Sequence, residues 1–306
     1  MHFDPSSIPD AWPVSRRFVL PEWKTKISPW INDHCSKEEV HTAYRETCFY
    51  WLDLLASELG PNYYIAESEN FLLLCAQEDK DYERTLNSLG EAEREILKGW
   101  KGVAQKNSTG PHVVILFEEI SDYYDYVSLF HPEAGEFGGS CGMMINRLYY
   151  HMVIARSDFG ECHSTLFHEL THVLVSHLPL PLWLNESLAM TSERLLTRSS
   201  EVYLTPELAS EHHEYWDEDT IQDFWNGEGF HAPDPAQKLC YSLADILVCH
   251  LIKRPNFRRF VLAANWQDAG QAAALKYLGG SVGDFAAIFL GDGYWEPDWL
   301  TESIEQ

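Results

Sequence analysis

The segment His168-Glu169-Leu170-Thr171-His172 places two histidines four residues apart, with a glutamate directly after the first. Residues four apart lie on one face of a helix, so the imidazoles of His168 and His172 can bind a single metal ion. Glu169 would lie beside that face, where its carboxylate can take a proton from an attacking water and pass it to a leaving amine. Imidazole and carboxylate ligands suit zinc. The motif therefore predicts one Zn²⁺ per chain and metal-assisted hydrolysis.

The identity of the third protein ligand decides which class of zinc site this is. With 14 histidines in 306 residues, a chance HExxH is expected in roughly a few per cent of such chains, so the motif needs support. The metzincin pattern requires a glycine and a histidine where this chain has Val175 and Leu178, so that class is excluded. Pro179 and Pro181 must end the first helix, and a second, reversed helix could then bring Glu186 back over the two histidines.

The segment HELTHVLVSHLPLPLWLNESLA (168–189) resembles the gluzincin metallopeptidases, and most of all their peptidase MA-like group. In these proteins a second helix supplies a Glu ligand from a W-L-N-E-G-x-A type sequence. The similarity covers roughly residues 66–290. It implies that His168, His172 and Glu186 bind zinc and that Glu169 is the catalytic base. Ser187 departs from the family pattern, which has Gly at that position.

The resemblance also implies roles for residues outside the motif. Proteins of this clan commonly use a Tyr or His of the helical lobe to donate a hydrogen bond to the developing oxyanion, and Tyr241 is the candidate; the alternative is an aromatic packing residue. Asn185 is expected to orient a ligand or the second helix, or to make a hydrogen bond at the helix N-terminus. Residues 149–155 correspond to the sheet edge along which a peptide pairs, which makes Tyr150 and Met152 candidate substrate-binding residues.

The elements that must position these residues change in kind along the chain. Residues 70–117 have the order strand, helix, strand, whereas nearly everything after about residue 160 has helical periodicity. We therefore expect an α+β, zincin-like fold: a mixed sheet with helices in an N-terminal lobe, an all-helical C-terminal lobe, and the metal site in the cleft between them. The expected divisions are an irregular arm and packing helix (1–65), an α/β lobe ending in the HExxH helix (66–178), and a helical lobe carrying the third ligand (179–306).

Periodicity and breakers also predict individual elements. An irregular arm covers residues 1–35, and a capping box at Ser36 and Glu39 opens a helix that ends before Gly60. The other expected helices are 79–103, 121–129, 162–177, 184–197, 236–253, 256–265, 268–278 and 281–290. The expected strands are 70–76, 112–117, 143–145 and 149–155.

Composition limits the partners. The chain has 22 Lys and Arg against 47 Asp and Glu, a formal net charge of −25, which disfavours nucleic acid and anionic membranes as partners. The apolar runs are too short for a membrane span, and the N-terminus lacks the pattern of a secretory signal. Seven cysteines without a CxxC pair fit reduced thiols, so we expect a cytoplasmic protein. The oligomeric state cannot be predicted.

Several other polar residues have an ordinary structural interpretation. His163 and His177 are expected to be capping or surface groups, and His212 and His213 to belong to a solvated acidic loop, 211–219. Cys162 is expected to be a free buried thiol. Gly138 and Gly139 fit a turn before a strand, although they would also allow a peptide to approach closely.

The leading hypothesis is a zinc-dependent metallopeptidase that acts on a peptide or protein substrate. A zinc amidohydrolase acting on a non-peptide amide would use the same chemistry. A zinc-binding interaction protein without catalysis is the third possibility, but such a protein has no need for Glu169 at its position.

Overall fold

The protein has an α+β fold of two compact units. The computed structural model describes residues 3–76, 82–106, 109–131, 140–146, 149–156, 159–199 and 204–298, with the side chains of 159–162 left out. Within these ranges there are twelve α-helices and a mixed five-stranded sheet. The first unit comprises Met1–Gly99 and Gln105–Leu174, and the second comprises Trp100–Ala104 and Val175–Gln306.

The sheet of the first unit has the strand order β3-β4-β5-β7-β6. Its strands are β3 (Tyr63–Glu67), β4 (Phe71–Ala76), β5 (His112–Phe117), β6 (Gly142–Ile145) and β7 (His151–Ala155). The three central strands are parallel to one another, and the two outer strands pair antiparallel. Every residue of β4, β5 and β7 is buried, as expected of parallel strands covered on both faces. The predicted order strand, helix, strand is confirmed, with α3 (Tyr82–Gly99) as the crossover.

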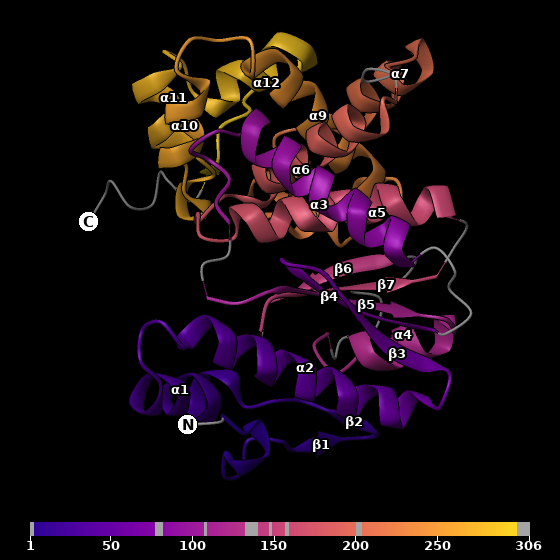
Figure 1. Cartoon of the computed structure of the whole chain (residues 1–306). Coiled ribbons are helices and arrows are strands. Elements are labelled where there is room, and N and C mark those ends of the chain that lie inside the picture. The colour runs from indigo at the N-terminus through magenta and orange to yellow at the C-terminus, as the bar shows by residue number, and fades with distance from the viewer. Residues whose placement is uncertain are drawn as a thin grey trace. The chain divides into compact units, whose positions relative to one another are not determined.

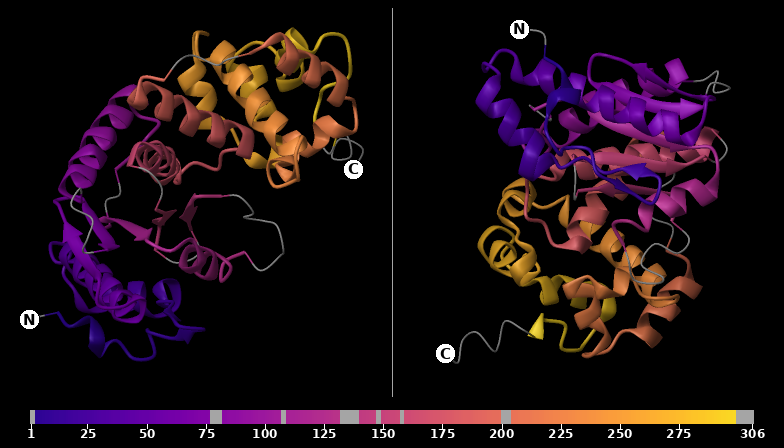
Figure 2. Two further views of the ribbon diagram at one scale, coloured as in Figure 1. Left: turned by 90° about the vertical axis from the view of Figure 1, so that its right-hand side faces the viewer. Right: turned by 90° about the horizontal axis from the view of Figure 1, so that it is seen from below.

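Helices cover both faces of this sheet (Figure 1). On one face lie α1 (Ser28–His34), α2 (Val40–Leu59) and α4 (Ile120–Val127), and on the other lie α3 and α5 (Phe159–Val175). Figure 2 shows α5 seen along its axis above the sheet. Alternate strand residues, such as Val113 and Ile115, join the core formed with α2, because successive side chains of a strand point to opposite faces.

The expected edge strand is an inner strand. β7 pairs with β5 on one side, through Val114 and Met152, and with β6 on the other, through Met144 and Met152. Its backbone N–H and C=O groups therefore belong to two ladders, and the side chain of Met152 is completely buried. The prediction that a peptide pairs along residues 149–155 is wrong for this reason. Among the described strands, β6 is the edge on this side of the sheet.

The predicted irregular arm, 1–35, contains regular structure. Helical turns η1 (Pro5–Ser7) and η2 (Trp23–Ile27) accompany α1 and the short strands β1 (Val14–Ser15) and β2 (Phe18–Val19). Buried side chains at Trp23, Ile27 and Ile31 hold this segment on α2, and Trp51 Nε1 donates a hydrogen bond to the carbonyl oxygen of Val19. Periodicity did not reveal these elements because each of them is shorter than the window in which a period can be seen.

The boundaries of α2 follow the signals in the sequence. The carboxylate of Glu39 accepts a hydrogen bond from the backbone N–H of Ser36 at 3.0 Å, which is one half of the predicted capping box. The helix begins at Val40 and ends at Leu59. Gly60 follows with a backbone φ of +118°, which residues that carry a Cβ atom rarely adopt.

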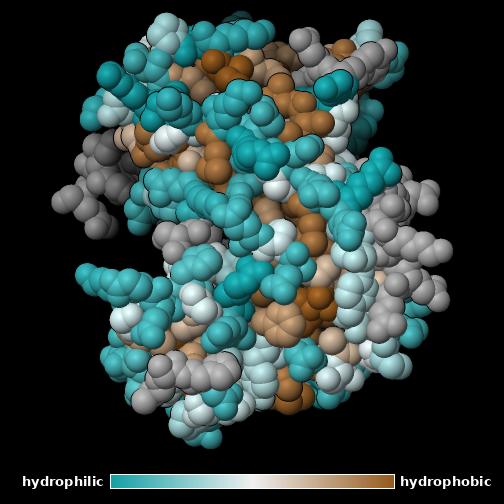
Figure 3. Space-filling model, viewed as in Figure 1, coloured by the Kyte–Doolittle hydropathy of each residue, from teal (hydrophilic) through white to brown (hydrophobic). Residues whose placement is uncertain are grey.

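All secondary-structure elements described for the second unit are helices, as the change of pattern near residue 160 predicts; the isolated bridge between Lys101 and Ala104 is the exception among its described residues. Apolar side chains appear among polar ones on its surface (Figure 3). Its helices are α6 (Leu182–Thr197), α7 (Pro206–Tyr215), α8 (Thr220–Asn226), α9 (Ala236–Leu251), α10 (Phe257–Ala263), α11 (Gln271–Tyr277) and α12 (Val282–Leu290), with turns η3 (Glu228–Phe230) and η4 (Trp266–Asp268).

None of the described helices has both the length and the apolar composition to cross a membrane unaided. The pair α11 and α12 meets these criteria only when both helices are taken together, and the pair is bent by 86°.

The expected solvated loop at 211–219 is partly α7, and His212 is fully buried. Trp216 Nε1 donates to His212 Nδ1 at 2.8 Å, so the proton of this imidazole is on Nε2, which donates to Ser242 Oγ at 2.8 Å. Burial lowers the pKa of His212 from 6.5 to about 4. The neutral imidazole therefore joins α7 to α9. The acidic residues around His212 in the sequence indicate a solvated loop instead.

Because the pKa of His212 is depressed in the folded state, its contribution to stability is present above pH 6.5 and is lost as the pH falls toward 4. We expect His212→Gln to unfold more readily at pH 6.5. Between pH 6.5 and about 4.5 its free energy of unfolding should fall less than that of the wild type, by up to about 1.4 kcal/mol per pH unit. Urea unfolding at both pH values measures this. His213→Gln, on the exposed face of α7, is the control. An equal fall in the free energy of unfolding between the two pH values for all three proteins would refute the assignment.

Candidate metal centre

Both histidines of the motif lie on α5, within its last two turns. Their ring centroids are 4.7 Å apart with the planes at 77°, so the two imidazoles project from one side of the helix. The opposite side of α5 is apolar and buried at Leu166, Leu170 and Leu174. The amphipathic pattern that predicts the helix is thus also what orients the two imidazoles.

Glu186 joins the two histidines. The first helix ends at Val175, ahead of Pro179 and Pro181, and α6 begins at Leu182, so Glu186 lies in its second turn. One ligand atom each from His168, His172 and Glu186 can be chosen such that all lie within 4.8 Å of one another. Ligand atoms of a tetrahedral zinc ion lie about 3.3 Å apart, so small side-chain rotations would close the set.

The burial and chemistry of this group fit a cation. His172 and Glu186 are buried and His168 is half-buried. Two imidazoles and one carboxylate form the ligand set of the His₂Glu catalytic zinc sites, which leave one position open for water or substrate. The residues that the sequence predicts as ligands are therefore the residues that the structure brings together.

Glu169 is 7 % exposed and lies in the same unit as Tyr123, a residue of α4 that belongs to no recognisable sequence motif. Burial raises the pKa of Tyr123 well above its usual value, the hydrogen bond with Ser140 Oγ acts in the opposite direction, and the negative charge of Glu169 raises it further. The phenol thus stays protonated close to the expected catalytic base. No local pattern could have indicated Tyr123, because it lies 46 residues before Glu169 in the sequence.

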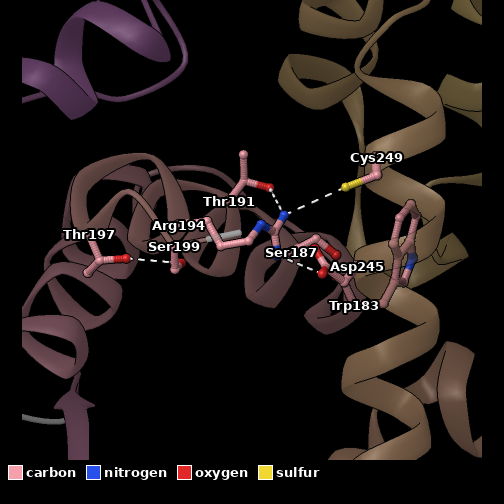
Figure 4. Close-up of polar contacts among 8 residues, drawn as sticks. All are labelled: Trp183, Ser187, Thr191, Arg194, Thr197, Ser199, Asp245 and Cys249. Carbon is pink, nitrogen blue, oxygen red and sulfur yellow. Dashed lines mark hydrogen bonds and ion pairs between the residues drawn. The ribbon is translucent and has the colours of Figure 1, made fainter. Parts of the chain in front are cut away.

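α6 is held in the helical unit by its tryptophan. Trp183 is buried, donates a hydrogen bond from Nε1 to the carbonyl oxygen of Ala269 at 3.0 Å, and packs against the rings of Trp225 and Phe260. Ser187, which stands where the resembling family has Gly, donates from Oγ to the carbonyl oxygen of Trp183 at 2.5 Å (Figure 4). Its hydroxyl is therefore satisfied inside the helix, so the substitution leaves no unpaired polar group.

An ion pair holds the other end of α6. Arg194 Nη1 lies 2.6 Å from Asp245 Oδ2 on α9, and Arg194 Nη2 contacts Thr191 Oγ1 and Cys249 Sγ (Figure 4). The two side chains are 20 % and 10 % exposed. Burial raises the pKa of Asp245 although Arg194 acts in the opposite direction, so the ionised carboxylate depends on its partner.

The remaining candidates are not part of the His168, His172 and Glu186 cluster. Tyr241 is half-buried on α9, with its ring 5.1 Å from that of Phe230 in a T-shaped contact, which fits the packing alternative; its oxyanion role stays a prediction. Asn185 is half-buried in the first turn of α6, and its role also stays a prediction. Tyr150 is 40 % exposed just before β7.

Two other histidines lie on either side of the motif, five residues before His168 and five residues after His172. His163 is half-buried on α5 with its ring 5.8 Å from that of Phe167, and His177 is exposed after the helix. Gly138 and Gly139 and the side chain of Cys162 lie outside the described residues.

Comparison with known proteins adds no assignment: the chain matches no model of a protein family, and no curated protein matches its sequence. The geometry of the site therefore carries the functional argument.

If the cluster binds metal, each ligand is needed. We expect zinc at about one ion per chain in the wild type, and loss of most of it in His168→Ala, His172→Ala and Glu186→Ala, because two protein ligands hold zinc far more weakly than three. Elemental analysis after dialysis against a weak chelator measures this. His163→Ala and His177→Ala are the controls, since they remove imidazoles that are close to the motif in the sequence but are not part of the cluster. Full zinc content in Glu186→Ala would exclude Glu186 as a ligand.

The Arg194–Asp245 pair predicts a matched pair of stability effects. Asp245→Ala leaves a partly buried guanidinium without its partner and should lower the free energy of unfolding by about 3 kcal/mol. Lys238→Gln breaks the exposed ion pair between Lys238 and Glu211 and should cost less than about 1 kcal/mol. Urea unfolding measures both. The double variant Arg194→Met, Asp245→Leu should recover much of the loss, and equal effects of Asp245→Ala and Lys238→Gln would contradict this account.

Proposed function

We propose that this protein is a zinc-dependent metallopeptidase of the gluzincin type, with a zincin-like fold. One observation carries the proposal: the ligand atoms of His168, His172 and Glu186 meet within 4.8 Å. The two histidines are adjacent through helix spacing alone, but nothing local requires a carboxylate from the next helix to join them. A buried carboxylate is costly unless its charge is compensated, and a divalent cation provides that compensation.

Each residue then has a task in peptide hydrolysis. A zinc ion bound by the three ligands would polarise the substrate carbonyl and lower the pKa of water at the open position. Glu169 accepts the proton of the attacking water and delivers it to the amine that leaves. Tyr241 is proposed to donate a hydrogen bond to the oxyanion, and Asn185 to hold α6 or a ligand in place. The retention of Glu169 favours catalysis over a purely structural zinc site, because zinc binding does not require it.

The substrate class follows from the same chemistry. A peptide or protein is proposed because the resembling family acts on peptide bonds. A non-peptide amide would be cleaved by the same groups, so the substrate has to be tested separately from the catalytic base.

Glu169→Gln separates catalysis from metal binding. We expect unchanged zinc content and a fall of at least about 100-fold in the hydrolysis of a mixed peptide library, because the amide cannot accept the proton. Mass spectrometry of the library measures cleavage, and elemental analysis measures zinc. Glu95→Gln, an exposed carboxylate on α3, is the control and should cleave like the wild type.

Two results would redirect the assignment. A wild-type protein that binds zinc but cleaves neither peptides nor small amides would be a zinc-binding interaction protein. Cleavage of small amides without cleavage of peptides would instead identify an amidohydrolase.

A further inference from the structure

The charge of this acidic protein is unevenly distributed. Residues 252–276 contain five of the 22 basic residues and only one of the 47 acidic residues, so this segment carries a formal charge of +4 while the rest of the chain carries −29. The basic residues are Lys253, Arg254, Arg258, Arg259 and Lys276. The segment begins directly after α9 and spans all of α10 and η4 and nearly all of α11.

The contacts of these cations leave their charge uncompensated: the guanidinium of Arg258 lies against Gly102, and Lys276 Nζ lies over the ring of Tyr277 at 5.1 Å. In the part of the chain that the structure describes, none of the five takes part in an ion pair. Arg254 lies over the ring of Phe285 at 4.6 Å. The single acid, Asp268, accepts hydrogen bonds from the backbone N–H groups of Gly270 and Ala272, so it caps α11. The positive charge is therefore not neutralised within the segment.

Large apolar side chains are exposed in the same segment. Trp266 is 62 % exposed, Leu275 55 % and Leu262 41 %. On α10, the buried face is Phe257, Phe260 and Val261. The exposed face, which carries Arg258, Arg259 and Leu262, is separate from that core face.

The same division occurs on the next helix. α11 buries Ala273 and Ala274 and exposes Leu275 and Lys276, and the two helices pack against each other. We call Arg258, Arg259, Leu262, Trp266, Leu275 and Lys276 the α10–α11 surface.

We propose that the α10–α11 surface docks the protein peripherally on an anionic phospholipid bilayer. Lys and Arg close to such a surface contribute about 1 kcal/mol each, and Trp favours the interface between headgroups and acyl chains. Exposed leucines gain by inserting into the outer acyl region. A bilayer accepts side chains that project from separate short helices without matching pockets, whereas a protein partner must supply a complementary surface.

The net charge of −25 does not oppose this docking, since charges more than about 8 Å from the bilayer are largely screened at physiological salt. The net charge of the whole chain disfavours anionic membranes, but docking depends on the charges that lie close to the bilayer. The docking surface is independent of the metal centre and of the proposed peptidase activity.

Co-sedimentation of the full chain with vesicles tests the proposal. We expect binding to phosphatidylcholine vesicles that contain phosphatidylserine, little binding to pure phosphatidylcholine, and weaker binding as salt rises. The double variant Arg258→Glu, Arg259→Glu should bind at least about 10-fold more weakly. Trp266→Ala should also bind more weakly while keeping the charge.

Matched controls separate the surface from general effects. Lys24→Glu, Lys26→Glu makes the same change of net charge at exposed lysines of η2, and Leu195→Ala removes a 70 % exposed leucine of α6. Both should bind like the wild type, and circular dichroism should show every variant folded.

Three outcomes would overturn the proposal. The wild type could fail to bind the acidic vesicles at low salt, or the η2 control could lose as much binding as the α10–α11 variant. The third outcome is that the same surface binds soluble polyglutamate as tightly as it binds vesicles, or that it mediates self-association in sedimentation velocity. Either result would identify an acidic protein as the partner instead.

Discussion

The candidate site depends on one electrostatic constraint: several titratable side chains are buried close together, away from water. Glu169, His172 and Glu186 are each less than a tenth exposed, and the ligand atoms of the predicted set lie within 4.8 Å of one another. Removing carboxylates from water costs several kcal/mol per charge unless cations or hydrogen bonds compensate it. A divalent ion at this position would make the arrangement favourable, so metal binding and the local stability of the two helices would be coupled.

Because Glu186 lies on α6, the contacts that hold this helix in place also position the carboxylate. Trp183 holds the start of the helix in an aromatic core, and Arg194 ties its later turns to α9 through Asp245. Glu186 lies between these two anchors, so its carboxylate is carried by a helix fixed on both sides. A ligand on a rigid element loses less conformational freedom when it binds metal than one on a loop. Ser187 fits this helix because its hydroxyl bonds to the carbonyl oxygen of Trp183.

Two other buried histidines are held by hydrogen bonds to neighbouring groups. His151 on β7 contacts Tyr126 Oη through Nε2 and the carbonyl oxygen of Tyr149 through Nδ1, and burial lowers its pKa to about 4. His212 is similarly enclosed between Trp216 and Ser242. These neutral imidazoles serve packing, in contrast to His168 and His172, which face a carboxylate. The difference between a structural and a ligand histidine lies in what surrounds it.

Local sequence determined the helices and strands with strong periodicity and clear breakers. Pro179 and Pro181 separate α5 from α6, Gly60 ends α2, and the apolar runs of β4 and β5 flank a helix that makes their parallel pairing possible. The four-residue spacing of His168 and His172 sets their common face. These features follow from interactions between residues a few positions apart, which a sequence displays directly.

Only the tertiary structure decided the rest. It placed β6 outside β7, buried His212, and brought Tyr123 close to Glu169 and Glu186 to the histidines. Strand order and long-range contacts are chosen by which packing of the whole chain buries the most apolar surface with its polar groups satisfied. That choice is made by residues far apart in the sequence, so no short segment contains it.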